Sequence, residues 1–211
     1  MATETEHRCR LCLVTPVDRT ADDFAPHLAA ALSAGDVATL FIAGSPTQRA
    51  EMISACTEMA QSAGVAVIVQ GDIEAPARSG VDGLQIDLAD LPSVPASVRR
   101  DYITGVEGLT TRHAAMAAGE TDTDYLFFGR MDGEEPAGIF PPALELASWW
   151  ASVAIVPSVI MGGHALASID DAARSGIDFV ALGQAIWADD RGAAAAMSEA
   201  LGRLQNLVSA A

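Results

Sequence analysis

The chain has 211 residues and no lysine: all 12 of its basic residues are arginines, set against 28 aspartates and glutamates. Enzymes that form Schiff bases with their substrates, pyridoxal-phosphate enzymes and P-loop kinases depend on a lysine amine, so these classes are excluded. The formal net charge of −16 repels polyanions, so we expect neither nucleic acid nor a membrane surface as a partner. A pocket for a small anion must be built from arginine and backbone N–H groups.

Long apolar runs and an export signal are also missing. No run approaches the roughly 20 apolar residues of a membrane span, and the opening residues, MATETEHRCR, contain no apolar core. Cysteine is scarce, and Cys9, Cys12 and Cys56 are an odd number in a long chain, as in reduced cytosolic proteins. We therefore expect a cytoplasmic protein in which residues 1–8 form a flexible tail.

Cys9 and Cys12 form a C-x-x-C pair, a spacing found in redox and metal sites. The pair lies in the run CRLCLVT, which resembles a buried strand, and residues three apart in a strand point to opposite faces. A redox pair lies at the start of a helix instead. We interpret both cysteines as thiols packed in the core.

A repeated unit indicates the fold. The hexapeptides ARSGVD (77–82) and ARSGID (173–178) each precede an apolar run, in a chain of which 50% is hydrophobic. Each copy is typical of a helix that ends at a glycine and leads into a strand buried on both faces, as in a parallel sheet covered by helices. The strands expected from such runs are 11–15, 39–43, 65–69, 83–86, 102–106, 125–129, 156–161 and 179–182.

Helical stretches separate these strands, at 22–33, 47–63, 111–118, 142–151, 166–175 and 191–208. Alternating strands and helices in a chain of 211 residues predict a single-domain (β/α)8 TIM barrel, near the lower size limit of that fold. A doubly wound open sheet is the alternative, but no G-x-G-x-x-G follows the first strand.

Glycines follow the last two expected strands, in Gly162-Gly163-His164 and Gly183-Gln184. TIM barrels commonly hold a phosphate between these two loops on backbone N–H groups, an arrangement that needs no lysine. We therefore expect Gly162, Gly163, Gly183 and Gln184 to bind a phosphorylated small molecule. The alternative is that the glycines only form turns, and His164 is either an acid–base or phosphate-binding group or a surface residue that caps the next helix.

Carboxylates follow two neighbouring strands, with Asp72 after the third and Asp87 and Asp90 after the fourth. Mg²⁺ prefers such oxygen ligands, so Asp72 and Asp90 are candidate metal ligands. A chain with 28 acidic residues also places carboxylates at strand ends by chance, so both interpretations stay open.

The sequence resembles the thiamine phosphate synthases and their relatives, the TenI-like thiazole tautomerases, over nearly its whole length. The runs that carry the resemblance are LCLVTP, GVAVIVQGD, SGVDGLQID, ITGVEGLT, DTDYLFFG, VPSVIMGGH and IDFVALGQAIW. The resemblance implies a small TIM barrel of thiamine biosynthesis that joins a pyrimidine diphosphate to a thiazole phosphate with Mg²⁺ and releases pyrophosphate. It places the thiazole phosphate on the four residues named above, and it places Asp90 on the metal.

Other positions depart from the family pattern. The family's Asn-Asp after the third strand falls on Gln70-Gly71, its histidine after the fourth strand on Gln85, and its serine after the fifth on Glu107. Its Gln-x-Arg-x-Lys after the second strand leaves at most Gln48 and Arg49. The loop after the sixth strand keeps neither the threonine nor the lysine of Pro-Thr-x-x-Lys, and Arg130 stands where the tautomerases have a catalytic histidine.

The substitutions remove groups that bind a diphosphate, whose departure is normally eased by Mg²⁺ and cationic side chains. Asp132, Glu134 and Glu135 lie where a cation is expected. Three hypotheses follow: a synthase with rearranged ligands that uses Arg49 or Arg130, an isomerase or tautomerase of a phosphorylated ligand with Glu107 and His164 as acid–base groups, and a non-catalytic binding protein.

Trp149 and Trp150 are adjacent in the helix expected at 142–151. One indole can pack inside while the other faces a second copy in a homodimer, because exposed aromatic patches often mark interfaces. The alternative is that both rings pack between this helix and the barrel.

Overall fold

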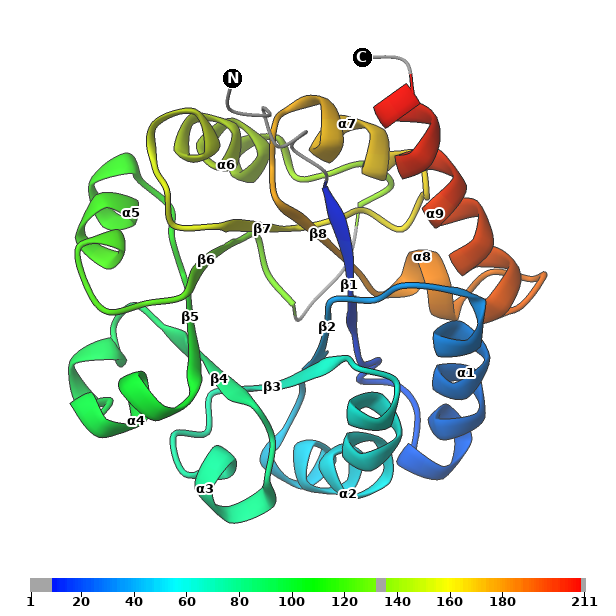
Figure 1. Cartoon of the computed structure of the whole chain (residues 1–211), viewed down its shortest axis with the longest axis horizontal. Helices are drawn as coiled ribbons and strands as arrows, with labels where there is room; N and C mark the ends of the chain where they lie inside the picture. The colour runs from blue at the N-terminus through cyan, green and yellow to red at the C-terminus, as the bar shows by residue number, and fades with distance from the viewer. Residues whose placement is uncertain (1–8, 132–135, 210–211) are drawn as a thin grey trace, which may run out of the picture.

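The computed structural model describes residues 9–131 and 136–209, which form a closed barrel of eight parallel strands surrounded by helices (Figure 1). The predicted TIM barrel is confirmed. The tail at 1–8 and the acidic residues Asp132, Glu134 and Glu135 lie outside the described residues. The strands are β1 Arg10–Val14, β2 Thr39–Ile42, β3 Ala66–Gln70, β4 Gly83–Asp87, β5 Ile103–Glu107, β6 Tyr125–Phe128, β7 Ser158–Met161 and β8 Phe179–Leu182.

Every expected strand is present to within one or two residues at each end. The sequence did not predict three short helices, α3, α4 and α8, which are too short to show a helical period in their apolar residues. The helices in the described part of the chain are α1 Ala21–Ala34, α2 Pro46–Ser62, α3 Ala75–Ser79, α4 Ala96–Asp101, α5 Arg112–Gly119, α6 Pro141–Val153, α7 Ser168–Arg174, α8 Gln184–Trp187 and α9 Ala193–Ser209.

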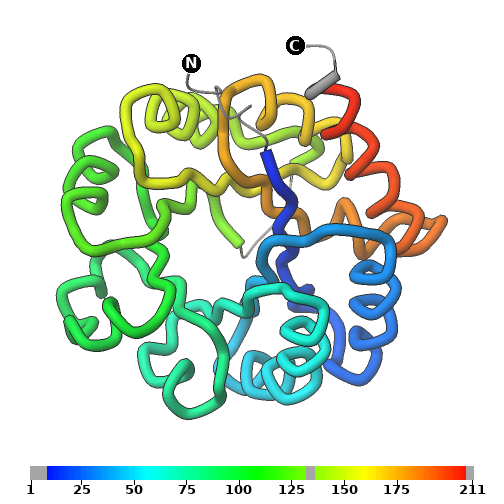
Figure 2. Tube along the Cα trace, in the orientation of Figure 1, coloured from blue at the N-terminus to red at the C-terminus, as the bar shows by residue number. Residues whose placement is uncertain are grey.

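The chain runs once around the barrel in sequence order, and the last helix, α9, packs against the first, α1 (Figure 2). The ring closes where β8 pairs with β1, with Leu13 opposite Leu182. Beyond the strands, the Trp187 indole N–H donates to the Val14 carbonyl at 2.6 Å. These contacts fix the loops after β8 against the first strand.

Two separate cores account for strands that are apolar on both faces. Leu11 and Leu13 point outward into the layer between barrel and helices, whereas Cys12 and Val14 point into the barrel with Phe41. Residues that alternate along a strand fill the two sides in turn.

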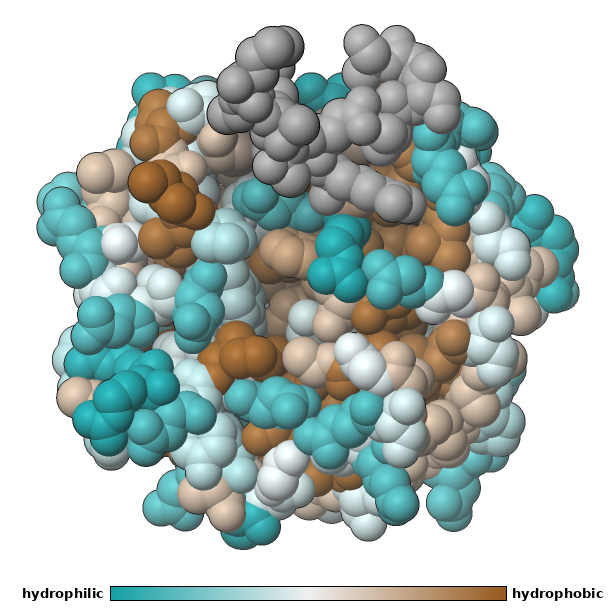
Figure 3. All heavy atoms as spheres, viewed as in Figure 1, coloured by the Kyte–Doolittle hydropathy of each residue, from teal (hydrophilic) through white to brown (hydrophobic). Residues whose placement is uncertain are grey.

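The surface seen in Figure 3 is mostly hydrophilic around its rim, with small apolar patches between.

The cysteines are core residues, as predicted. Cys9 lies in the outer core and Cys12 inside the barrel, so the C-x-x-C pair straddles the sheet, and both thiols are free. Burial raises the pKa of each of these two thiols to about 12.

The two tryptophans of α6 differ in environment. Trp150 is buried, and its indole N–H donates to the Val156 carbonyl at 2.9 Å. Trp149 is half-buried, with the Arg112 guanidinium 5.0 Å from its ring centroid. Trp150 therefore packs inside, and Trp149 is partly buried against the same core, while a homodimer stays a prediction.

We expect all three cysteines to be unreactive in the folded protein, since burial raises their pKa values and the thiolate is the reactive form. An aromatic disulfide reagent at mildly alkaline pH should release no signal from the native protein. In concentrated guanidinium chloride it should titrate three thiols per chain. Rapid reaction of a native thiol would contradict the packing described above.

Candidate functional site

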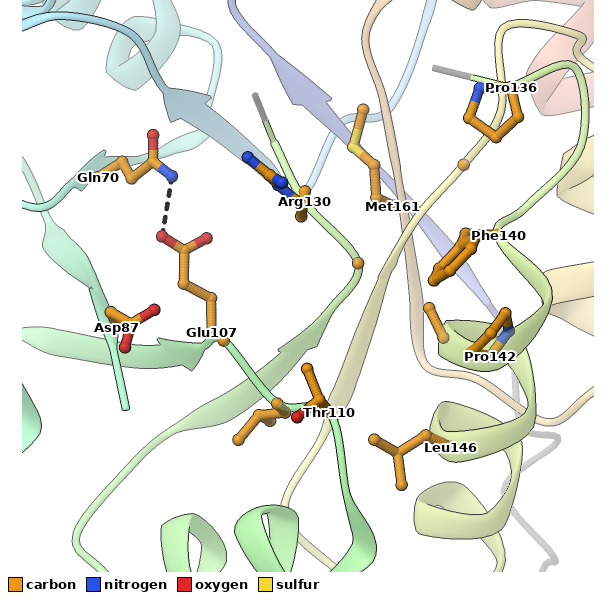
Figure 4. Close-up of a pocket in the computed structure, with 15 residues that line it drawn as sticks. Gln70, Asp87, Glu107, Thr110, Arg130, Pro136, Phe140, Pro142, Leu146 and Met161 are labelled. Atoms are coloured by element: carbon orange, nitrogen blue, oxygen red, sulfur yellow. Dashed lines mark hydrogen bonds between the residues drawn. The ribbon is translucent and has the colours of Figure 1, made fainter. Parts of the chain in front are cut away.

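A pocket of about 770 Å³, here called the mouth pocket, lies at the carboxyl ends of strands β3 to β7 (Figure 4). This is the end at which TIM-barrel enzymes carry their active sites. One wall is polar, with Gln70, Asp87, Glu107 and Arg130. The facing wall is mainly apolar, and its members include Phe140, Pro142, Leu146 and Met161 (Figure 4).

The polar wall is built from the last residues of neighbouring strands. Asp87 of β4 and Glu107 of β5 are opposite each other in the register, so the two carboxylates lie side by side. The Gln70 side-chain amide donates to Glu107 Oε1 at 2.8 Å. Thus Gln70, Glu107 and Arg130, predicted from three separate loops, line one pocket.

Gly108 leaves room for this arrangement. Its φ of +78° is a conformation that favours glycine, and a Cβ there would lie 2.5 Å from Asp87 Oδ2. Asp87 Oδ1 also accepts the Ala89 backbone N–H at 2.8 Å. The position of the Asp87 carboxylate therefore depends on a glycine in the next loop.

Gln85 lies inside the barrel on the same face of β4 as Asp87 and is fully buried. Its Oε1 accepts the Tyr125 hydroxyl proton, while Nε2 has no hydrogen-bond partner within the described part of the chain. Burial raises the pKa of Tyr125 well above its ordinary value, so the hydroxyl remains a donor. A buried amide that lacks a protein partner is suited to a bound water.

Gln48 and Arg49 take structural roles. Gln48 forms a capping box with Ser45 at the start of α2, and its Nε2 donates to the Val17 carbonyl at 2.6 Å. Arg49 donates to the Gly44 carbonyl at 3.1 Å. Neither residue lines the mouth pocket, and substrate binding by them stays a prediction.

The glycine loop after β7 is covered by residues 136–138, which we call the strap. The backbone N–H groups of His164 and Ala165 donate to the carbonyls of Pro136 at 2.8 Å and Ala137 at 3.1 Å. The N–H of Gly162 donates to Ala181 O at 2.8 Å, and that of Gly163 to Ser168 Oγ at 3.1 Å. The backbone N–H groups of the predicted phosphate residues Gly162 and Gly163, and of the two residues that follow them, are therefore bonded within the protein.

Gly163 permits the close approach of the strap, because a Cβ at this position would collide with the Ala137 carbonyl. The predicted residues line two different cavities. Gly162 lines the mouth pocket, whereas His164 and Gln184 line a second cavity of about 780 Å³ between the loop after β7 and the helices α8 and α9. Asp189, Glu199 and Arg203 complete the polar lining of the second cavity.

The candidate metal ligands do not come together as a cage. Asp72 accepts hydrogen bonds from Arg78 at 2.7 Å and from the Glu74 and Ala75 amides. Burial works to raise the pKa of Asp72, but these bonds outweigh it and lower the pKa. Asp90 is exposed, and the described residues contain no cluster of three or more His, Cys, Asp or Glu suited to a metal.

The protein groups present therefore do not by themselves fit Mg²⁺. Mg²⁺ at phosphate-handling sites is usually held by one or two carboxylates together with the phosphates of the substrate. Asp72 and Asp90 remain predicted Mg²⁺ ligands, each of which would act together with phosphates of the substrate.

Sequence reasoning missed several lining residues. The sequence marks Asp87 as a strand-end carboxylate without assigning it to a pocket, although its spacing of two from Gln85 places both on the inner face. Phe140 and Pro136 lie in a loop, where no periodic pattern indicates which residues face a site.

A closed barrel with a polar-walled pocket at the carboxyl ends of its strands has the architecture of a TIM-barrel enzyme. A family model described as "Thiamine monophosphate synthase" matches residues 11–186. The chain belongs to this family, and membership implies a role in thiamine biosynthesis.

Two curated relatives are similar over most of the chain. The thiamine-phosphate synthase of Rhodospirillum centenum is 35% identical, and the match covers 90% of this chain and 95% of the relative. The enzyme of the same name from Hyphomonas neptunium is also 35% identical, with 90% and 91% covered.

Solved structures share the fold. The thiamine phosphate pyrophosphorylase of Pyrococcus furiosus superposes with a TM-score of 0.72 at 16% identity, covering 96% of this chain and 98% of that one. The orotidine 5'-phosphate decarboxylase of Pyrococcus horikoshii does so with a TM-score of 0.67 at 11% identity, covering 92% and 99%. No helix within 9–131 and 136–209 is long and apolar enough to cross a membrane.

Gly108→Ala should destabilise the protein more than Gly64→Ala. Gly64 has nearly the same φ, +77°, but a Cβ added there would have nothing within 4 Å, so this substitution measures the backbone strain alone. We expect about 1 kcal/mol of lost unfolding free energy at Gly64. At Gly108 we expect roughly 1 kcal/mol more, because the Asp87–Ala89 bond is lost as the carboxylate moves away. Denaturant unfolding measures the unfolding free energy of both variants. Equal losses at Gly108 and Gly64 would contradict the contact between position 108 and the Asp87 carboxylate.

Proposed function

We propose that the protein is a thiamine-phosphate synthase that joins a pyrimidine diphosphate to a thiazole phosphate. The observation that carries the proposal is the mouth pocket, lined by Gln70, Glu107, Arg130 and Gly162, in a chain 35% identical to curated synthases. The bond between the pyrimidine methylene carbon and the diphosphate breaks, and its electron pair leaves on pyrophosphate. The lone pair of the thiazole ring nitrogen forms the new C–N bond.

This reaction needs no proton transfer at the carbon that reacts. Catalysis then depends on holding the two substrates in line and on stabilising the charges that develop. Arg130, which lines the polar wall, is the cation we assign to the departing diphosphate. When bound, Mg²⁺ neutralises charge on a leaving phosphate, but the described residues do not form a metal cage, and no step proposed here depends on one.

We assign the thiazole phosphate to Gly162, Gly163, Gly183 and Gln184. The strap carbonyls of Pro136 and Ala137 already accept the N–H groups of His164 and Ala165. Phosphate oxygens must therefore replace these carbonyls in order to bind the loop. An N–H bond to an anion is roughly twice as strong as one to a neutral carbonyl. The charge of the phosphate therefore favours the exchange.

An isomerase in which Glu107 and His164 act on one ligand finds less support. Glu107 lines the mouth pocket and His164 lines the second cavity. A general acid and a general base must both reach the reacting group. Formation of thiamine phosphate by the purified protein distinguishes an enzyme from the non-catalytic alternative.

Purified protein supplied with pyrimidine diphosphate, thiazole phosphate and a magnesium salt should form thiamine phosphate, and the gene should rescue a thiamine-requiring strain. Arg130→Ala should lower kcat/KM by about 10²-fold, the size expected for loss of one group that stabilises developing charge. Arg100→Ala, which removes an exposed arginine paired with Asp101, is the matched control and should leave the rate unchanged. Binding of thiazole phosphate with neither product nor rescue would show a non-catalytic protein.

Thiazole phosphate should shift the backbone amide resonances of His164 and Ala165, because these N–H groups exchange a strap carbonyl for a phosphate oxygen. The amide of Ala137 in the strap should shift with them. NMR titration measures this, and the unphosphorylated thiazole alcohol is the matched ligand control, expected to leave these amides unchanged. Saturable binding of the phosphate with no change at His164 and Ala165 would rule out this loop as its site.

A further inference from the structure

The polar wall of the mouth pocket carries more negative than positive charge. Asp87 and Glu107 are register neighbours that face the same pocket. Among the described lining residues, Arg130 is the one positively charged side chain against these two carboxylates. Like charges held side by side are stabilised by a cation between or above them.

The facing wall determines which kind of cation suits the pocket. Phe140 is 59% exposed although it is a large apolar residue, and it lines the pocket together with Leu146 and Met161 (Figure 4). An aromatic face attracts organic cations, whose charge is spread over a ring and weakly hydrated. A small metal ion would lose its water shell on this wall without compensation.

We propose that Glu107, with Asp87, is a specificity-determining residue that makes the mouth pocket prefer a flat heteroaromatic cation over a neutral ring of the same shape. The inference rests on the proposed function, in which formation of the C–N bond converts a neutral thiazole into a thiazolium cation. The carboxylates then stabilise positive charge as it appears on the ring. The two carboxylates repel pyrophosphate, whereas Arg130 of the same wall attracts it, so the two products are attracted to different side chains.

The test compares two ligands that differ in one charge: thiamine phosphate, and its deaza analogue in which carbon replaces the positively charged ring nitrogen. Calorimetry should show that the wild-type protein prefers thiamine phosphate by about tenfold, the size of one partly screened charge–charge contact. Glu107→Gln keeps the shape of the side chain and an oxygen that accepts from Gln70, and it should remove most of the preference. Asp87→Asn should reduce it as well.

Glu51→Gln is the matched control. Glu51 is exposed on α2, so the variant changes the net charge of the chain by the same amount as Glu107→Gln without touching the pocket. It should keep the full preference for the charged ligand. Unfolding curves of all variants should superpose on that of the wild type.

Equal affinities for the charged and neutral ligands in the wild type, or a preference that survives in Glu107→Gln, would overturn the inference. In either case the proposed function stands if the protein still binds thiazole phosphate and forms thiamine phosphate. Absence of binding by thiazole phosphate and by both test ligands would overturn the inference and the proposed function together.

Discussion

Closure of the sheet between β8 and β1 is the constraint on which the rest of the molecule depends. Every strand is parallel to its neighbours, so closing the ring brings all eight carboxyl ends to one rim. Residues that end β3, β4 and β5 thereby meet around one pocket although long stretches of chain separate them. The Trp187–Val14 hydrogen bond extends the closure beyond the strands and sets the position of the loops that follow β8.

Most of this architecture could be predicted from the sequence, because a strand buried on both faces must be apolar throughout and several helices, such as α1, α3 and α7, end at or next to a glycine. The pocket was only partly predictable. Its polar wall follows from strand ends, but the strap depends on hydrogen bonds between backbone segments 28 residues apart, which leave no periodic signal. The hydrogen bond from Gln48 to the Val17 carbonyl was also hidden, since only the folded loops bring these two residues within reach.

The lysine-free composition is consistent with a division of labour in the site. Anions are assigned to backbone N–H groups and to arginine, whose guanidinium stays charged under all physiological conditions. The carboxylates Asp87 and Glu107 then face the part of the reaction in which positive charge appears. Arg130 is the one cation among the described lining residues of the mouth pocket, and no lysine amine adds to it.

Coupling between the two halves of the site follows from the strap. Pro136, whose carbonyl accepts the His164 N–H after β7, also lines the mouth pocket. On the proposed assignment, a phosphate that takes over those amides would release Pro136 and so change the shape of the pocket in which the ring must lie. The affinity for the phosphate would then help to order the reacting ring, and binding energy at a remote group would lower the barrier at the reacting atoms.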